Sequence, residues 1–214
     1  IINTLPNWYN IQINKLCGNI TNKNLEIFKN KKNIYYLELY NCNNISDVNT
    51  LNNCYNLVLY CCNNILDVSA LGNCHNLTLD YCENILDVSA LDNCNNLTLY
   101  KCQNISDVST LSNCYNLILS WCNISDVSAL GNCHNLTLHE CKNISDVSAL
   151  GNCYNLILSY CNNILDISAL SNCHNLTLNG LKISDVSALG NCQNLTLEKC
   201  DNILNVNALG NCKK

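Results

Sequence analysis

Apolar side chains recur along the chain with a period of 20 residues, shortened to 19 in two places. From Leu71 to Ala90 the sequence reads LGNCHNLTLDYCENILDVSA, and the next twenty residues repeat the frame as LDNCNNLTLYKCQNISDVST. The leucine pairs that mark the nine units are Leu37/Leu39, Leu57/Leu59, Leu77/Leu79, Leu97/Leu99, Leu117/Leu119, Leu136/Leu138, Leu156/Leu158, Leu176/Leu178 and Leu195/Leu197. A fixed period of this size indicates a solenoid in which each unit stacks on its neighbours.

Each unit predicts one short strand followed by a narrow return. The N-L-x-L segment alternates apolar and exposed positions, as a strand with two inward side chains does. After it the apolar residues fall three apart, at Cys82, Ile85, Val88, Leu91 and Cys94. This spacing suits 3₁₀-like turns, and the return is too short for a full α-helix. We therefore expect an α/β-type repeat solenoid with one parallel β-sheet, a 3₁₀ and turn return side, and little α-helix.

The first residues do not obey the frame, so we divide the chain into residues 1–33, an N-terminal cap that is partly helical, and residues 34–214, the solenoid. Thr21 or Asn22 is placed to cap a short helix. Apolar residues of the segment are expected to cover the first unit: Leu5, Trp8, Ile11, Ile13, Leu16, Ile20, Leu25, Ile27 and Phe28.

The frame resembles the leucine-rich repeat, whose core pattern is L-x-x-L-x-L-x-x-N/C. The return from Ile85 to Leu91 is similar to internalin-type repeats, and the frame from Cys94 to Cys102 is similar to the cysteine-containing repeats of F-box adaptor proteins. The Asn- and Cys-rich repeat sequence also resembles repeat proteins of amoebae and of the giant DNA viruses that infect them. The resemblance covers about residues 34 to 212 and implies a leucine-rich-repeat fold.

Cysteines form two columns in the frame, one before each strand and one after it. The first comprises Cys54, Cys74, Cys94, Cys114, Cys133, Cys153, Cys173, Cys192 and Cys212, and the second Cys42, Cys62, Cys82, Cys102, Cys122, Cys141, Cys161 and Cys200. Leu181 replaces one member of the second column, which indicates an apolar site. We favour core packing of free thiols. Disulfides would need converging Cβ vectors, and zinc would need spacings such as C-x₂-C; both stay open as weaker alternatives.

Aspartate and asparagine columns also follow the frame. The Asp column runs Asp47, Asp67, Asp87, Asp107, Asp126, Asp146, Asp166 and Asp185, and Asn205 completes it. An Asn there fits a side chain that bonds the backbone two residues on, so we favour turn capping over calcium binding. The Asn before each strand is expected to form a ladder of stacked amides. We expect no metal site, no cofactor and no catalytic residue, because every candidate, including the four histidines, belongs to a repeated column.

Composition narrows the possible partners. The net charge is −5 and all 11 basic residues are Lys, without a basic stripe of the kind that nucleic acid requires. No apolar segment approaches the length of a membrane span. Reduced buried thiols favour an intracellular, cytoplasmic protein. No signal peptide is visible at Ile1, although a removed one is compatible with a start at Ile rather than Met.

Variation within the frame is concentrated in two adjacent columns at the C-terminal ends of the strands. One column reads Tyr60, Asp80, Tyr100, Ser120, His139, Ser159, Asn179, Glu198, and the next reads Cys61, Tyr81, Lys101, Trp121, Glu140, Tyr160, Gly180, Lys199. Aromatic residues with scattered charge are typical of protein interfaces, and neutral drift on a solvated face is the alternative explanation of the variation. The predicted partner-binding residues are Tyr60, Asp80, Tyr81, Tyr100, Lys101, Trp121, His139, Glu140, Tyr160 and Lys199.

The sequence thus favours a non-enzymatic scaffold that binds a protein partner through the exposed face and rim of the sheet. The alternative is a structural component of a larger assembly, formed by lateral or end-to-end packing of the solenoid. The chain stops at Cys212-Lys213-Lys214 without a polar cap unit, which suggests self-association through that end.

Overall fold

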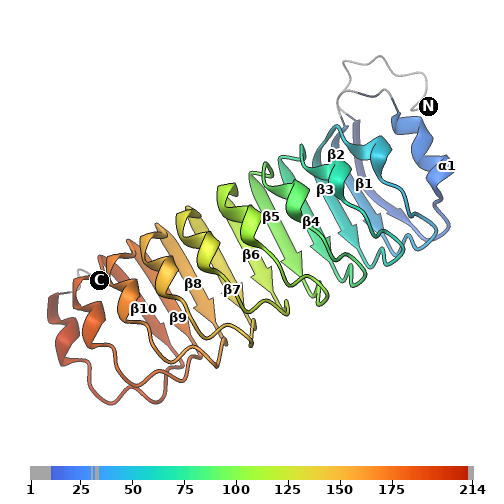
Figure 1. Cartoon of the computed structure of the whole chain (residues 1–214). Helices are drawn as coiled ribbons and strands as arrows, with labels where there is room; N and C mark the ends of the chain where they lie inside the picture. The colour runs from blue at the N-terminus through green and yellow to red at the C-terminus, as the bar shows by residue number, and fades with distance from the viewer. Residues whose placement is uncertain (1–10, 30, 32–33, 212–214) are drawn as a thin grey trace.

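The computed structural model describes residues 11–29, 31 and 34–211, and its elements follow one another as a single stack (Figure 1). The strands are β1 (Ile11–Cys17), β2 (Ile34–Tyr40), β3 (Cys54–Tyr60), β4 (Asn76–Asp80), β5 (Asn96–Tyr100), β6 (Asn116–Ser120), β7 (Asn135–His139), β8 (Asn155–Ser159), β9 (Asn175–Asn179) and β10 (Asn194–Glu198). The helical turns are α1 (Asn22–Leu25) and the 3₁₀ segments η2 (Glu26–Phe28), η3 (Asn49–Leu51), η4 (Ser69–Leu71), η5 (Ser89–Leu91), η6 (Ser109–Asn113), η7 (Ser128–Asn132), η8 (Ser148–Asn152), η9 (Ser168–Asn172), η10 (Ser187–Asn191) and η11 (Asn207–Asn211).

The ten strands form one parallel sheet whose order is the order of the sequence. Each repeat, here called a rung, lies in register with the next, so that Leu57 pairs with Leu77 and Leu59 with Leu79. The register continues without a shift through the rung that is one residue shorter, where Leu117 pairs with Leu136. The missing residue is therefore absorbed outside the strand.

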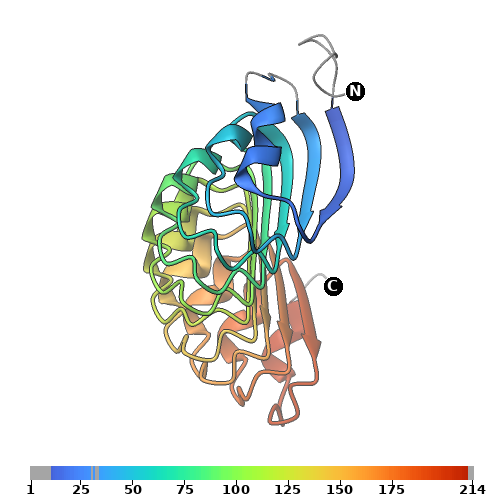
Figure 2. The same cartoon turned by 90° about the vertical axis from the view of Figure 1, so that its right-hand side faces the viewer.

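The 3₁₀ turns form a second layer opposite the sheet, as the view along the stack shows (Figure 2). Each turn is closed by a backbone bond of the 3₁₀ type, such as Leu71 N–H to the Val68 carbonyl at 2.9 Å. A 3₁₀ turn has three residues per turn, so every third side chain points inward, and this matches the three-residue spacing of the apolar residues in the return. The expected solenoid with one parallel sheet and a 3₁₀ return is confirmed.

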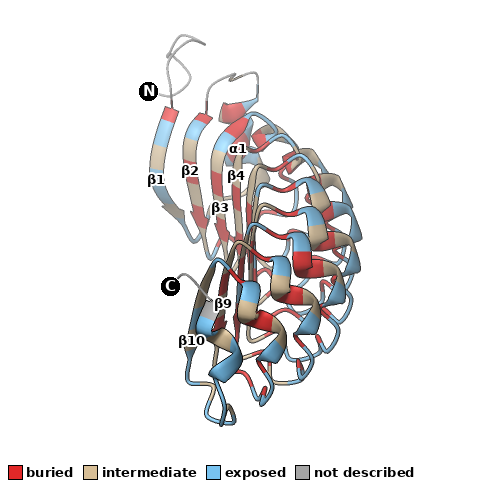
Figure 3. Ribbon diagram, turned by 90° about the vertical axis from the view of Figure 1, so that its left-hand side faces the viewer, coloured by how far each residue is buried: buried red, intermediate tan, exposed pale blue. Residues whose placement is uncertain are grey.

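The core lies between the two layers and runs the length of the stack (Figure 3). Both leucines of the strand, the two Cys columns and the Ile, Val and Leu of the return are buried in β3 to β9. None of the described cysteines is joined in a disulfide, and those of the two columns are buried except Cys200. Most of the buried thiols also donate to a backbone carbonyl, for example Cys62 Sγ to Leu39 O at 3.5 Å. Core packing of free thiols is the role that the structure assigns to these columns.

The polar columns serve the scaffold as expected. In the Asp column each carboxylate accepts from the backbone N–H two residues on, as Asp107 does from Ser109 at 2.9 Å, and Asn205 does the same for Asn207 at 2.8 Å. From Asn76 onward, the Asn that begins each strand donates to its counterpart on the preceding rung, ending with Asn194 Nδ2 to Asn175 Oδ1 at 2.5 Å. Turn capping and the amide ladder are both confirmed.

The N-terminal segment contributes a strand as well as a short helix. Strand β1 pairs with β2, but its register shifts between Ile13 and Leu16, which pair with Leu37 and Leu39. One extra residue there shifts the register, and Leu16 lies 23 positions before Leu39 rather than 20, which is why the repeat pattern does not reveal this strand. Thr21 precedes α1, and its backbone N–H donates to Asn24 Oδ1 at 2.9 Å. Leu5 and Trp8 of the predicted cap lie outside the described residues.

Candidate functional site

The ten predicted binding residues lie in two neighbouring columns at the rim of the sheet where the strands end, and we call them the rim patch. Strand pairing aligns the first column, with Tyr60 opposite Asp80 and Asp80 opposite Tyr100. The second column follows one residue later. Nine of the ten side chains are half-buried and Lys199 is exposed, so most of them lie against one another rather than extending into water.

The second column has an unusual backbone. Its members Cys61, Tyr81, Lys101, Trp121, Glu140, Tyr160 and Lys199 all have φ between 50° and 57°, in the left-handed region, and Gly180 has φ +64°. From Cys61 to Gly180, each N–H of the column donates to the strand-end carbonyl of the next rung, such as Lys101 N–H to Ser120 O at 2.8 Å. The left-handed conformation disfavours β-branched residues, and the column contains none. That absence is a sequence signal for the turn which the frame analysis did not use.

Three tyrosines and a lysine form the first half of the rim patch. The Tyr81 ring lies 5.8 Å from that of Tyr60 and 5.7 Å from that of Tyr100. Lys101 Nζ lies 4.4 Å from the Tyr81 ring centroid and 5.5 Å from that of Tyr100, and it donates to Tyr81 Oη. The same ammonium lies 5.5 Å from the Trp121 ring and so joins the two halves.

The second half continues from Trp121. Its ring meets His139 edge-on at 6.4 Å, and His139 meets Tyr160 in the same manner at 5.8 Å. Tyr160 Oη accepts from Lys199 Nζ at 3.0 Å across an intervening rung. The structure therefore places these predicted residues in one chain of contacts that runs along the rim.

Two carboxylates interrupt the aromatic chain. Burial raises the pKa of Asp80, partly offset by the positive charge of Lys101, and Asp80 Oδ1 is buried without a hydrogen-bond partner. The hydrogen bond that Lys101 donates to Tyr81 raises the pKa of Lys101 above that of a free lysine. Glu140 has an ion-pair partner, because Lys142 Nζ lies 3.1 Å from its Oε2. Asp80 is therefore the unsatisfied acidic group of the rim patch.

Three further residues extend the rim patch beyond the prediction. Tyr40 stacks on Tyr60 with ring centroids 4.2 Å apart, and Lys15 Nζ lies 3.8 Å from the Tyr40 ring. Lys142 Nζ lies 5.3 Å from the Trp121 ring. Tyr40 belongs to the same column one rung earlier, so extending the frame backwards identifies it. Lys142 follows the turn and belongs to neither variable column, and no signal in the frame marks it.

Tyrosine and histidine also stack along the opposite rim, in the position after the first Cys column. Tyr115, His134, Tyr154 and His174 lie ring on ring, with centroid distances between 4.3 and 4.8 Å. Tyr35, Tyr55 and His75 form a second stack on the same rim. In the described part of the chain, no three His, Cys, Asp or Glu side chains are grouped so as to hold a metal ion. These histidines act as stacking partners of the tyrosines.

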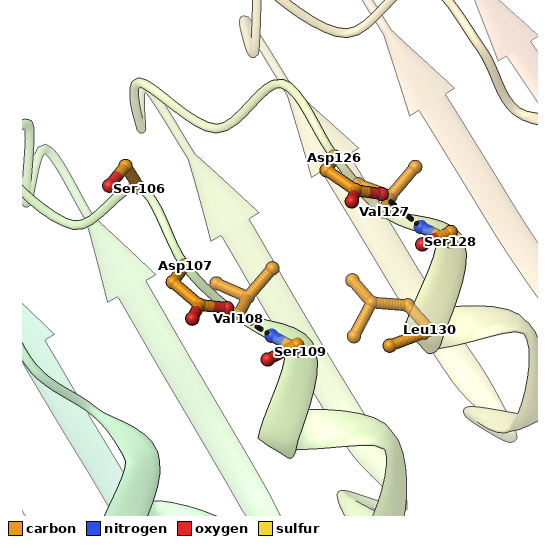
Figure 4. Close-up of a pocket in the computed structure, with 9 residues that line it drawn as sticks. Ser106, Asp107, Val108, Ser109, Asp126, Val127, Ser128 and Leu130 are labelled. Carbon is orange, nitrogen blue, oxygen red and sulfur yellow. Dashed lines mark hydrogen bonds between the residues drawn. The ribbon is translucent and has the colours of Figure 1, made fainter.

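A groove of about 330 Å³ runs between two rungs on the return side (Figure 4). It is lined by Asp107, Ser109, Asp126, Ser128 and their neighbours. Both carboxylates already accept from the backbone, Asp107 from Ser109 and Asp126 from Ser128 at 2.8 Å. This groove is part of the turn-capping scaffold.

Across residues 11–29, 31 and 34–211, no helix is both long and apolar enough to cross a membrane. No protein-family model and no curated protein matches the sequence. Solved structures do match it. An internalin, InlF, from Listeria monocytogenes is 23% identical, with a TM-score of 0.60 over 93% of this chain and 71% of the other. Internalin C2 from the same organism is 26% identical, with a TM-score of 0.54 over 83% of this chain and 84% of the other.

The repeat frame, the parallel sheet and these matches define the fold: the chain has a leucine-rich-repeat solenoid fold like that of the two internalins. In this chain the fold is built from rungs of 19 and 20 residues with two columns of buried thiols, and it carries the rim patch.

Proposed function

We propose that this protein is a non-enzymatic scaffold that binds a protein partner through the rim patch. The observation that carries the proposal is the left-handed column, in which Tyr81, Lys101, Trp121 and Tyr160 occupy a conformation that glycine or asparagine adopts at lower cost. Gly18, Asn41 and Gly180 fill the same position on other rungs. The fold therefore does not require large side chains there.

The composition of the rim patch supports binding of a protein. Tyr and Trp carry a disproportionate share of the energy in protein interfaces, and their rings lose little conformational entropy when they are held in advance. Here the rings of Tyr60, Tyr81 and Tyr100 are already ordered by one another, and Lys101 is held between Tyr81 and Trp121. A partner would meet a surface whose side chains are largely preorganised.

The chemistry of the repeated frame supports a non-enzymatic role. The thiols are buried with raised pKa values, since burial raises that of Cys74 and Cys94 to about 12, and the Asp carboxylates are engaged in turn capping. A nucleophile needs an accessible, activated group beside a base. The repeated columns provide scaffold contacts in place of such pairs.

The test is an affinity capture from lysate of the source cells that compares three forms of the protein. The rim variant is Tyr100→Ala/Trp121→Ala/Tyr160→Ala. The matched control, Leu66→Ala/Leu86→Ala/Leu165→Ala, removes apolar side chains that are 63%, 66% and 67% exposed and lie outside the rim patch. We expect partners to be recovered with wild type and the control but lost with the rim variant. Equal recovery with all three forms would remove the basis of the proposal.

Self-association is a second candidate, because strand β10 has an unpaired edge in the described structure. Leu195, Leu197 and Ile203 are only partly buried there, whereas their counterparts on inner rungs are fully buried. An open sheet edge with apolar neighbours is able to pair with a second copy. Light scattering over a range of concentrations tests this: a monomer at every concentration would rule out this second candidate.

A further inference from the structure

A second amide ladder follows the strand-end turn, at Asn64, Asn84, Asn104, Asn143, Asn163 and Asn202. Each side chain donates to a group of the preceding rung, usually a backbone carbonyl. Asn84 Nδ2 donates to Asn63 O at 2.8 Å, and Asn104 Nδ2 donates to Glu83 O at 2.7 Å. The ladder ties successive turns together just outside the rim patch.

The two shorter rungs lack this Asn. They read Cys122-Asn123-Ile124 and Leu181-Lys182-Ile183, where the longer rungs have two residues between the corresponding positions. The carbonyl of Gln103 therefore faces a rung that has no Asn at the donating position. Beyond the first short rung, Asn143 Nδ2 reaches the side-chain Oδ1 of Asn123 at 2.6 Å in place of a backbone carbonyl.

An open groove of about 430 Å³ lies at this interruption, and we call it the Trp121 notch. Its lining includes Gln103, Asn104, Trp121, Asn123, Lys142 and Asn143. The volume is at the lower end of the ~300–1,000 Å³ range of ligand pockets. One wall is Trp121 of the rim patch, and Lys142 lies against that ring while paired to Glu140.

The second short rung differs because a ring covers it. A Cβ added to Gly180 would fall 2.5 Å from Tyr160 Cε1, so the Tyr160 ring lies directly over that rung. It is held there by its bond from Lys199. The interruption beside Trp121 is instead open to an outside group.

We propose that the Trp121 notch binds a carboxamide side chain, Asn or Gln, carried by the protein partner of the rim patch. The inference rests on the proposed function and identifies the partner's anchoring residue. A carboxamide has both the donor for the Gln103 carbonyl and the acceptor for the second N–H of Asn143. It would continue the hydrogen-bond pattern that Asn84 and Asn104 make on their own rungs.

Other side chains fit the notch less well. A carboxylate offers no donor to the Gln103 carbonyl and would lie beside Glu140. An ammonium offers no acceptor and would lie beside Lys142. An apolar side chain would leave the groups lining the notch without partners, which costs more than a hydrogen bond gains. The aliphatic stem of Gln or Asn has the Trp121 ring to pack against.

The test uses a displayed library of random twelve-residue peptides, selected against wild-type protein, with binding measured for synthetic copies of the enriched sequences. We expect a family of binders with Asn or Gln at one fixed position. Changing that residue to Asp or Glu should weaken binding about tenfold, the effect of losing a buried hydrogen bond of roughly 1.4 kcal/mol. Enriched sequences without a common carboxamide would overturn the proposal.

Protein variants locate the binding. An Asn inserted between Asn123 and Ile124 restores the longer rung and fills the notch, and we expect it to weaken binding at least as much as the peptide change. Asn143→Ala removes one amide of the notch without altering the length of any rung, and Asn84→Ala removes the same kind of amide three rungs away. We expect Asn143→Ala to weaken binding and Asn84→Ala to leave it unchanged.

The variants also separate this proposal from the one on which it rests. If Tyr100→Ala/Trp121→Ala/Tyr160→Ala abolishes binding while the insertion and Asn143→Ala do not affect it, the rim patch binds and the notch proposal is wrong. If none of these variants alters binding, or if the library enriches no sequence, both proposals fail. Circular dichroism of each variant confirms that the solenoid is folded before binding is compared.

Discussion

The Tyr160 ring lies against Gly180, with Cε1 only 2.5 Å from where a Cβ of residue 180 would be. Gly180 also has φ +64°, a conformation that glycine adopts without a steric penalty. By crossing this rung, the Tyr160 hydroxyl reaches Lys199 Nζ at 3.0 Å. A glycine on a shortened rung thus extends the contacts of the rim patch by one rung.

Gly180→Ala tests this relationship, with Gly18→Ala as its matched control. Gly18 has φ +72° and nothing within 4 Å of its added Cβ, so that change introduces backbone strain alone, about 1–2 kcal/mol. Gly180→Ala adds displacement of the Tyr160 ring and loss of the bond to Lys199. We expect it to lower the free energy of unfolding in urea by more than the control does. Equal losses would mean that the ring moves aside freely.

The left-handed column predicts that side-chain shape matters more than size at its positions. Cys61→Val exchanges two residues of similar volume, but Val is β-branched and Cys61 has φ +51°. Asn41 has φ +53° at the same position one rung earlier. We expect Cys61→Asn to be near neutral and Cys61→Val to cost about 1–2 kcal/mol in chemical denaturation. Similar stabilities for the two variants would show that the turn accommodates branching.

The buried thiols predict unfolding at alkaline pH. Burial raises the pKa of Cys74 and Cys94 to about 12 and that of Cys82 to about 11, whereas an unfolded thiol titrates near ~8.5. A raised pKa means that the native thiols stay protonated while the unfolded ones ionise. Their contribution to stability is therefore intact below about pH 8.5 and is lost as pH rises toward the native values.

The expected loss of folding free energy at alkaline pH is large enough to unfold the protein. At pH 10 each thiol that stays protonated disfavours the folded state by about 2 kcal/mol, and several together exceed the ~5–15 kcal/mol stability of a typical domain. We expect a steep loss of circular dichroism between about pH 9 and pH 10 in the presence of a reducing agent. A folded signal at pH 10.5 would show that the two Cys columns do not carry this linkage.

The Asp column predicts a contrast between its amide and alanine variants. Asp126 Oδ1 accepts from Ser128 N–H at 2.8 Å, and this bond lowers the pKa of the carboxyl. Asn accepts the same bond, as Asn205 does on its rung, whereas Ala removes it. We expect Asp126→Asn to melt near the wild-type temperature and Asp126→Ala to melt clearly below it. Equal melting of both variants below wild type would instead make the charge essential.

The sequence predicted the sheet, the return and the roles of the Cys, Asp and Asn columns because each depends on contacts repeated on every rung. The position of Leu77 is occupied by Leu in all nine units, so the periodicity of the sequence identifies it as a core position. Strand β1 was missed because one extra residue between Ile13 and Leu16, and the 23-residue distance from Leu16 to Leu39, take it out of the 20-residue frame. The left-handed column was missed although the lack of β-branched residues marked it.

The sequence identified the residues of the rim patch from the variable columns, but it did not predict which of these residues contact one another. Variation singled out Tyr81, Lys101 and Trp121, yet which ring lies on which depends on side-chain packing that no period describes. The bond from Lys199 to Tyr160 crosses a rung, so alignment of neighbouring repeats does not suggest it. The length change at Asn123 is visible in the sequence, whereas the open notch beside Trp121 requires the structure.

Asp80 provides a test that links stability to the rim patch. Burial raises its pKa, and its Oδ1 has no hydrogen-bond partner, so the ionised carboxylate disfavours the folded state at neutral pH. As pH falls through the raised native pKa toward the unfolded value of ~3.9, the native carboxyl takes up its proton first and wild-type stability rises. Asp80→Asn removes this dependence, and Asn179 shows that an amide fits the same column.

We therefore expect Asp80→Asn to be more stable than wild type at pH 7 and the difference to shrink toward pH 4, measured by urea denaturation across that range. The Asp126 carboxyl has a lowered pKa, so its linked stability is lost only below the unfolded value of ~3.9, and its own Asn variant should show no such change between pH 7 and pH 4. If Asp80→Asn stabilises the free protein but weakens peptide binding, the carboxylate is kept for a donor on the partner. If the variant is less stable than wild type at pH 7, Asp80 has a stabilising partner and its place in the proposed interface loses this support.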